Sequence, residues 1–158
     1  MRLYLVRHAD AKEKSEDPER HLSAAGRDQA RRMADFLRPM GLRVGAVWHS
    51  TKVRAMETVA CLSGAVTADD GLLERDDLGP KDPVDTVVRA VRKSDRDLMI
   101  VGHLPYLGNL ASKLLAGSED AVRFHFAPAA AVCLEFDAQN GWRLNWLVTP
   151  DMLGGTGR

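Results

Sequence analysis

The segment LYLVRHADA (residues 3–11) passes from apolar to polar residues within a few positions. Its first four residues are apolar and strand-prone, which predicts a short buried strand. Arg7 and His8 follow directly, so a guanidinium and an imidazole are expected side by side at the carboxyl end of that strand. Because a nearby cation disfavours the protonated imidazole, the segment predicts a neutral histidine next to a fixed positive charge.

The rest of the chain alternates between strand and helix signals. Charged residues fill positions 12–21, which predicts a solvated loop, and helical spacing of apolar residues begins after Ser23, a suitable N-cap. The Asn140-Gly141 pair is a β-hairpin signal between two late strands. This order predicts an α/β sandwich around a mainly parallel sheet, with an antiparallel element late in the chain. Further strands are expected at 44–50, 98–101, 121–126, 129–136 and 142–148, and further helices at 52–64, from Asp82-Pro83 and from Leu104-Pro105.

Composition excludes several classes of protein. The chain has 158 residues, with 22 basic and 22 acidic side chains. A net charge of zero argues against a nucleic-acid or membrane-surface binder, which needs a basic excess. Cys61 and Cys133 are too far apart for a disulfide framework, and no apolar run is long enough for a signal peptide or a membrane span. We therefore expect a single cytoplasmic domain over residues 1–158.

Polar side chains follow three of the expected strands. Parallel α/β sheets bind ligands beyond the carboxyl ends of their strands, so these side chains are expected to share one crevice. Two arginines suit a phosphoryl group, because each guanidinium can hold two oxygens. One histidine can attack phosphorus while the other donates a hydrogen bond to an equatorial oxygen. From the residues alone, an anion site and a set of structural polar residues are equally open. The residues concerned are Arg7, His8, Ser50, Arg54 and His103.

The histidines give no metal signal. His8, His49 and His103 lack paired-ligand spacing such as H-x-x-x-H. We interpret His21, His49 and His125 as structural or surface residues. No metal site is therefore expected.

Five segments of the chain match known motifs. LYLVRHADA resembles an R-H-G signature, and RHLSAAGRDQA is similar to R-x-L-T-x-x-G-x-x-Q-A. HSTKVRAMETV resembles S-x-x-x-R-A-x-E/Q-T-A, and VGHLPYLG resembles V-G-H-x-P. With the ending LNWLVTPDML, the chain resembles the histidine phosphatase superfamily (phosphoglycerate mutase-like), and within it the SixA-like branch of small phosphohistidine phosphatases. Ala9 replaces the glycine of R-H-G, as it often does in that branch.

The resemblance implies a fold and a reaction. The family fold is a three-layer α/β/α sandwich with a mainly parallel six-stranded sheet that contains an antiparallel member. His8 would attack the phosphoryl group and become phosphorylated, and water would then hydrolyse the intermediate. Arg7, Arg54 and His103 would bind the phosphoryl oxygens and neutralise charge in the transition state. No metal and no cofactor is implied.

Glu74 is the candidate for a general acid. Many family members place a glutamate acid after the helix that carries the second arginine, and Glu74 lies in that region, whereas the SixA-like branch commonly lacks a clear acid there. We favour a solvated acidic loop for Glu74 and keep the general acid as the alternative. A phosphohistidine leaving group needs such an acid less than an alkoxide does.

The expected substrate is phosphohistidine on another protein. The connections after the first strand and the second helix are interpreted as short, which leaves little chain to cover a small metabolite. We therefore expect a monomer whose partner is a phosphorylated protein, such as a histidine phosphotransfer domain. Two alternatives stay open: a phosphatase of small phosphoesters or phosphoramidates that uses the same His8 nucleophile, and a phosphate-binding module without turnover.

Overall fold

The computed structural model describes residues 1–154 and contains a six-stranded sheet of order β5-β3-β6-β1-β7-β8. β5, β3, β6 and β1 are parallel to their neighbours in that group, whereas β7 is antiparallel to both β1 and β8. The predicted mainly parallel sheet with an antiparallel member is confirmed. The strands are β1 (Arg2–Arg7), β3 (Ala46–Ser50), β5 (Leu72–Arg75), β6 (Leu98–Gly102), β7 (Ala131–Asp137) and β8 (Gly141–Val148).

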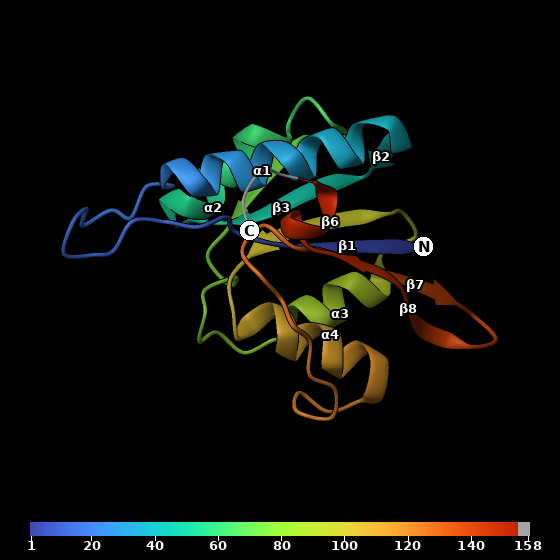
Figure 1. Cartoon of the computed structure of the whole chain (residues 1–158). Helices are drawn as coiled ribbons and strands as arrows, with labels where there is room; N and C mark the ends of the chain where they lie inside the picture. Colours follow the sequence, from blue (N-terminus) through green and yellow to red (C-terminus); the bar gives the residue numbers. More distant parts are fainter. Residues whose placement is uncertain (155–158) are drawn as a thin grey trace.

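Helices cover both faces of the sheet, with α1 and α2 on one face and α3 and α4 on the other (Figure 1). This arrangement is the expected three-layer α/β/α sandwich. Within residues 1–154, none of the helices is long and apolar enough to cross a membrane. The helices are α1 (Ala24–Leu37), α2 (Val53–Leu62), α3 (Asp85–Lys93) and α4 (Tyr106–Ala116), with the short 3₁₀ helices η1 (Arg38–Met40) and η2 (Pro150–Leu153).

The strand β1 is apolar on both sides because both faces of the sheet are covered. Leu3 and Leu5 pack with the α3 and α4 side chains, whereas Tyr4 and Val6 pack with those of α1 and α2. Successive strand residues point to opposite faces, so a doubly covered strand needs a continuous apolar run rather than an alternating one. The same burial fixes the position of the polar residues that follow β1.

The prediction of a strand at residues 121–126 is wrong. The Val122 N–H donates to the Ser112 hydroxyl over 2.9 Å, and the Phe126 carbonyl accepts from the Arg7 guanidinium over 2.8 Å. These backbone groups therefore form hydrogen bonds with side chains and not with a neighbouring strand. The Phe126 ring still contributes to the core on the α3–α4 side, which explains the apolar pattern of the segment.

The sixth strand is instead β5, which lies in the segment interpreted as a solvated acidic loop. β5 pairs with β3 at the edge of the sheet and leaves Leu72 and Leu73 partly exposed. The expected strand at 44–50 is divided between β3 and β2 (Leu42–Val44), and β2 pairs with β4 (Val66–Ala68) in a separate two-stranded sheet. The third helix begins at Asp85 and not at Asp82, whose carboxylate accepts from the N–H of Gly79.

A long arm follows β1. Residues 11–22, which we call the arm, leave the sheet and return, and an isolated antiparallel bridge between Ala11 and Leu22 closes its base (Figure 1). The arm is exposed at residues 13–16, 18 and 19, as expected for its charged sequence. The expectation of a short connection after the first strand is therefore wrong, because residues 8–23 separate β1 from α1.

Candidate active site

His8 lies at the carboxyl end of β1 with its ring held in one orientation. Its backbone N–H donates to the Gly102 carbonyl over 2.8 Å, which ties it to the end of β6. Its Nδ1 lies 2.7 Å from the Ala9 carbonyl oxygen, an atom that can only accept, so Nδ1 carries the proton. The Nε2 atom then keeps its lone pair, and the Arg54 Nε–H donates to it over 3.3 Å. Of the two ring nitrogens, Nε2 is therefore the one that presents a lone pair.

The surroundings of His8 keep its ring neutral. Burial is the largest cause that lowers its pKa, from the ordinary 6.5 to about 4. The cations Arg54, Arg7 and Arg20 lower the pKa further, while the hydrogen bond to the Ala9 carbonyl partly opposes them. The predicted neutral histidine agrees with this geometry, but Arg7 is a smaller cause than burial or Arg54.

Two further nitrogen atoms close to His8 are buried without a partner among the described residues. His103 follows β6, is 1% exposed, and its ring centroid lies 5.0 Å from that of His8. Arg7 donates from Nη1 to the Phe126 carbonyl, but its Nε has no hydrogen-bond partner within the described residues, and neither has His103 Nδ1. Buried polar atoms normally have partners, so two orphans beside one imidazole indicate space for an acceptor such as an oxyanion.

His103 is also held neutral at ordinary pH. Its Nε2 lies 2.7 Å from the Ser50 hydroxyl oxygen, and burial lowers its pKa to about 3. The further causes, in decreasing order, are His8, Arg54, Lys52 and Arg20. The site thus combines two neutral imidazoles with several fixed cations.

The second helix places Arg54 against His8 through a chain of hydrogen bonds. The Ala9 N–H donates to the Thr58 hydroxyl over 3.0 Å, and that hydroxyl donates to the Arg54 carbonyl over 2.7 Å. Ala9 is fully buried, so its methyl group is accommodated where the R-H-G form has glycine. The threonine of the S-x-x-x-R-A-x-E-T segment therefore connects the strand end to the first turn of α2.

The other motif residues brace the loops around the site. The Ser23 hydroxyl caps α1 by accepting from the Gly26 N–H over 3.0 Å. An added Cβ at Gly26 would lie 1.9 Å from the Asp10 carbonyl oxygen, so only glycine allows α1 to approach this backbone. The Glu57 carboxylate accepts from the Leu22 N–H over 2.6 Å and fixes the base of the arm to α2.

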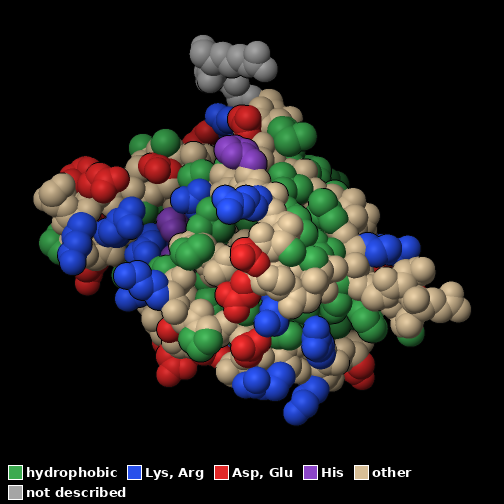
Figure 2. Space-filling view, turned by 90° about the horizontal axis from the view of Figure 1, so that it is seen from below, with side chains coloured by type: hydrophobic (Ala, Val, Ile, Leu, Met, Phe, Trp, Pro, Cys, Tyr) green, Lys and Arg blue, Asp and Glu red, His purple; other side chains and the backbone are tan. Residues whose placement is uncertain are grey.

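Sequence reasoning missed two cations of the site. Arg20, in the arm, lowers the pKa of His8, Arg54 and His103, in each case less than burial does. Lys52, just before α2, also lowers the pKa of His103. Arg20 has a φ of 57° and its Nε donates to the Lys12 carbonyl across the arm. On the side where the arm lies, Lys and Arg side chains cluster beside a histidine (Figure 2). The R that opens the R-x-L-T segment was the available signal for Arg20.

Glu74 and the remaining histidines lie outside the His8–His103 pair. Glu74 is exposed on β5, in register with His49 of β3. The His49 Nδ1 bonds to the Ser50 carbonyl, His21 pairs with carboxylates of the arm, and His125 is exposed. Among the residues 1–154, no group of three or more His, Cys, Asp or Glu side chains is arranged to hold a metal ion.

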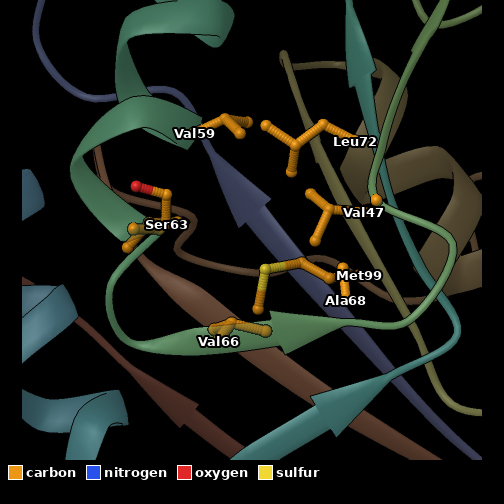
Figure 3. Close-up of a pocket in the computed structure, with 9 residues that line it drawn as sticks. Val47, Val59, Ser63, Val66, Ala68, Leu72 and Met99 are labelled. Carbon is orange, nitrogen blue, oxygen red and sulfur yellow. The ribbon is translucent and has the colours of Figure 1, made fainter.

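A separate cavity of about 210 Å³ lies under α2 and carries no catalytic chemistry (Figure 3). Val47, Val59, Leu72 and Met99 point into it, and its polar side chain, Ser63, donates its hydroxyl to a carbonyl of its own helix. None of the residues that line it belongs to the cluster around His8.

The fold and the histidine pair define the class of protein. The sequence model of the histidine phosphatase superfamily (branch 1) matches residues 3–78, the part of the chain that carries β1, α1, α2 and β5. The chain belongs to this superfamily. The homology supports a phosphatase, a hydrolase of phosphoryl groups.

Particular relatives narrow the comparison to the SixA-like branch. The chain is 26% identical over 156 residues to phosphohistidine phosphatase SixA of Escherichia coli (strain K12), covering 95% of this chain and 94% of that protein. It is 30% identical over 125 residues to an uncharacterized protein of Picosynechococcus sp., covering 74% of each. A solved structure of the protein histidine phosphatase SixA complexed with tungstate has a TM-score of 0.85 at 23% identity, covering 98% of this chain and all of that one.

Proposed function

We propose that the chain is a phosphohistidine phosphatase that acts on a phosphorylated protein through a phosphorylated His8. One observation carries the proposal: the lone pair of a neutral His8 Nε2 faces Arg54, and two buried nitrogen atoms of neighbouring residues, Arg7 Nε and His103 Nδ1, have no partner in the described part of the chain. A tetrahedral oxyanion bound there would satisfy both donors at once. The similarity to SixA supports the substrate class.

In the first half-reaction, His8 Nε2 attacks the phosphorus atom in line with the leaving nitrogen. The bond between phosphorus and Nε2 forms as the bond between phosphorus and the substrate imidazole breaks, and the leaving nitrogen takes up a proton. Arg54 turns from Nε2 to a phosphoryl oxygen, while Arg7 and His103 hold the other oxygens and balance charge in the transition state.

In the second half-reaction, water attacks the phosphorus atom from the side that the product has left. The bond between phosphorus and Nε2 breaks, inorganic phosphate leaves, and His8 returns to its neutral form with Nδ1 still bonded to Ala9. Arg20, whose charge acts on His8, adds positive charge for the incoming phosphoryl group. No step requires a metal, so we expect full activity in the presence of a chelator.

A protein substrate suits the surroundings of the site. Glu74 is exposed, which fits a substrate whose leaving group needs no dedicated acid. We further propose that residues 1–158 act as one histidine phosphatase domain, as a monomer in the cytoplasm. The continuous sheet from β5 to β8 and the two free cysteines, Cys61 and Cys133, support these proposals.

The decisive experiment compares wild type with His8→Ala. Both proteins are incubated with a phosphorylated histidine phosphotransfer domain and, separately, with p-nitrophenyl phosphate, and phosphate release is measured. We expect release from the phosphoprotein to fall by at least about 10⁴-fold in His8→Ala, because the nucleophile is lost. His125→Ala, which removes an exposed histidine outside the site, serves as the matched control and is expected to keep full activity.

Each other outcome selects a different function. Equal release by wild type and His8→Ala contradicts the assignment of the nucleophile. Release from the ester alone favours a phosphatase of small phosphoesters, and substitution of Glu74 should then lower that activity. Phosphate binding that depends on Arg54 but is never followed by turnover favours a binding module. Loss of release in EDTA contradicts a metal-independent reaction.

A further inference from the structure

His103 can donate a hydrogen bond from Nδ1 only if that atom carries the single proton of the neutral ring. A neutral imidazole has a proton on one nitrogen and a lone pair on the other, and the partner of one nitrogen decides the state of the other. In this structure the partner of Nε2 is the Ser50 hydroxyl, 2.7 Å away, and both side chains are 1% exposed. Water does not compete for this contact.

The hydrogen bonds of Ser50 set the direction in which its hydroxyl donates. Ser50 Oγ accepts from the backbone N–H of Lys52 over 3.3 Å. Among the described residues, the other partner of Ser50 Oγ is this N–H donor, so His103 Nε2 is the acceptor available to the buried hydroxyl proton. Nε2 then accepts, and the ring proton lies on Nδ1, the buried atom without a partner.

We propose that Ser50 is a positioning residue that fixes His103 in the Nδ1–H tautomer, so that this atom donates to a phosphoryl oxygen in the transition state. The proposal rests on the proposed function, since it assigns His103 Nδ1 to the phosphoryl group. It gives a role to Ser50, which the sequence identifies only as the serine four residues before Arg54.

Nδ1 of His103 can carry a proton in two ways: the ring can be protonated, or the neutral ring can be held in the Nδ1–H tautomer. The charges around His103 favour the second way. Protonation of the ring would supply Nδ1–H as well, but His103 faces the cations Arg54, Lys52 and Arg20, and its ring is buried. A neutral ring without the serine would be free to hold its proton on Nε2. Its Nδ1 lone pair would then face the negatively charged oxygen, which is repulsive.

The first test is spectroscopic and uses the wild-type protein. Histidine side chains are labelled with ¹⁵N, and the His103 signals are assigned by comparison with His103→Gln. We expect a protonated Nδ1 and an unprotonated Nε2 for His103 at neutral pH, and a shift of the Nδ1–H signal when tungstate binds. A proton on Nε2 would overturn the proposal, whatever the activity of the enzyme.

The second test is kinetic and uses Ser50→Ala and Ser50→Thr. We expect Ser50→Ala to lower kcat for the phosphoprotein by about 10- to 100-fold with little change in KM, because the missing bond is made in the transition state. Ser50→Thr keeps a hydroxyl and should recover most of the loss. Ser112→Ala, which removes another buried serine hydroxyl with two hydrogen bonds, is the matched control and should leave kcat unchanged.

The two proposals fail in different ways. Unchanged kcat in a folded Ser50→Ala, or a His103 tautomer that is the same with and without Ser50, overturns the role of Ser50 and leaves the His8 nucleophile intact. Equal phosphate release by wild type and His8→Ala overturns the proposed function. If Ser50→Thr does not fold, the ¹⁵N spectrum of the wild type still decides the tautomer.

Discussion

The two ends of the sheet differ in whether their polar groups have hydrogen-bond partners. At the end that carries His8, an arginine nitrogen and an imidazole nitrogen are buried without partners among the described residues, and several cations face two neutral rings. The β7–β8 hairpin turn lies at the far end of the sheet (Figure 1). There Asp137 accepts from the N–H groups of Gln139 and Asn140, and Arg143 pairs with Glu135 at the surface.

The difference shows which end is built for a ligand. The turn satisfies its own polar groups with its own residues and with water, so it has no need of a partner. The His8 end leaves buried donors unsatisfied and like charges close together, both of which cost stability unless an anion is bound. Substitution of a charged residue should therefore lower activity at the His8 end and leave activity unchanged at the hairpin turn.

Among the variants that compare the two ends, Arg54→Met is expected to have the largest effect on activity. The substitution removes the cation that contacts His8 Nε2, and we expect kcat/KM to fall by about 10²- to 10³-fold. The free energy of unfolding should stay the same or rise, because one of several mutually repelling cations is gone. Steady-state kinetics and urea denaturation of the same preparation measure both. A large loss of stability would contradict the view that this end is strained by its charges.

Gly26→Ala should destabilise the protein by about 3 kcal/mol. The added methyl group meets the Asp10 carbonyl oxygen at 1.9 Å, which outweighs the gain in helix propensity of at most about 1 kcal/mol. Gly141→Ala in the hairpin is the control: its φ is 73° but no atom lies within 4 Å of the new Cβ, so a loss of about 1 kcal/mol is expected. Equal losses in urea denaturation would remove this contrast between the two ends.

Acid should weaken the fold through the His8 end. The pKa values of His8 and His103 are about 4 and about 3 in the folded chain, below the ordinary 6.5. The unfolded chain therefore binds protons first as pH falls below about 6.5, and stability is lost from there down to about pH 4 through His8 and to about pH 3 through His103. We expect about 2 kcal/mol less stability at pH 5 than at pH 7 from each of the two histidines, measured by denaturation at both values. The double variant His8→Asn, His103→Asn should lose most of this dependence.

The smallest expected effect comes from Arg143→Gln. Arg143 is half exposed and pairs with Glu135 and Asp137 over 3.5 and 3.6 Å, so its loss should change the free energy of unfolding by no more than about 0.5 kcal/mol. Phosphatase activity should not change. An activity loss here would mean that the hairpin end contributes to function, contrary to the comparison.

The sequence predicts this fold best where burial on both faces dictates the residues. The runs at 3–6 and 98–101 are apolar throughout because helices cover both sides of the sheet, and their ends locate His8 and His103. The edge strand β5 is not evident in the sequence, since its position comes from pairing with β3 and its leucines stay partly exposed. The segment 121–126 has the pattern of a strand, but side chains bind its backbone.

The sequence predicts those residues of the candidate site that follow the ends of strands or belong to recognised motifs. Arg7, His8, Arg54 and His103 follow from strand ends and motifs, and the structure brings His8 close to Arg54 and His103. Arg20 could not be placed, because the loop that carries it has no periodic pattern and only the fold of the arm brings its charge near His8. The contact between Ser50 and His103 likewise joins the ends of β3 and β6, which are distant in sequence, so it could not be read from the sequence.

The arm gives this protein a part that can be exchanged. Its base is fixed by the Ala11–Leu22 bridge and by the Glu57 carboxylate, while the stretch 13–19 is mostly exposed and contributes nothing to the core clusters. Exposed loops on a rigid scaffold accept insertions and new sequences readily. A protein engineer can therefore replace residues 13–19 with another sequence and leave the contacts around His8 untouched.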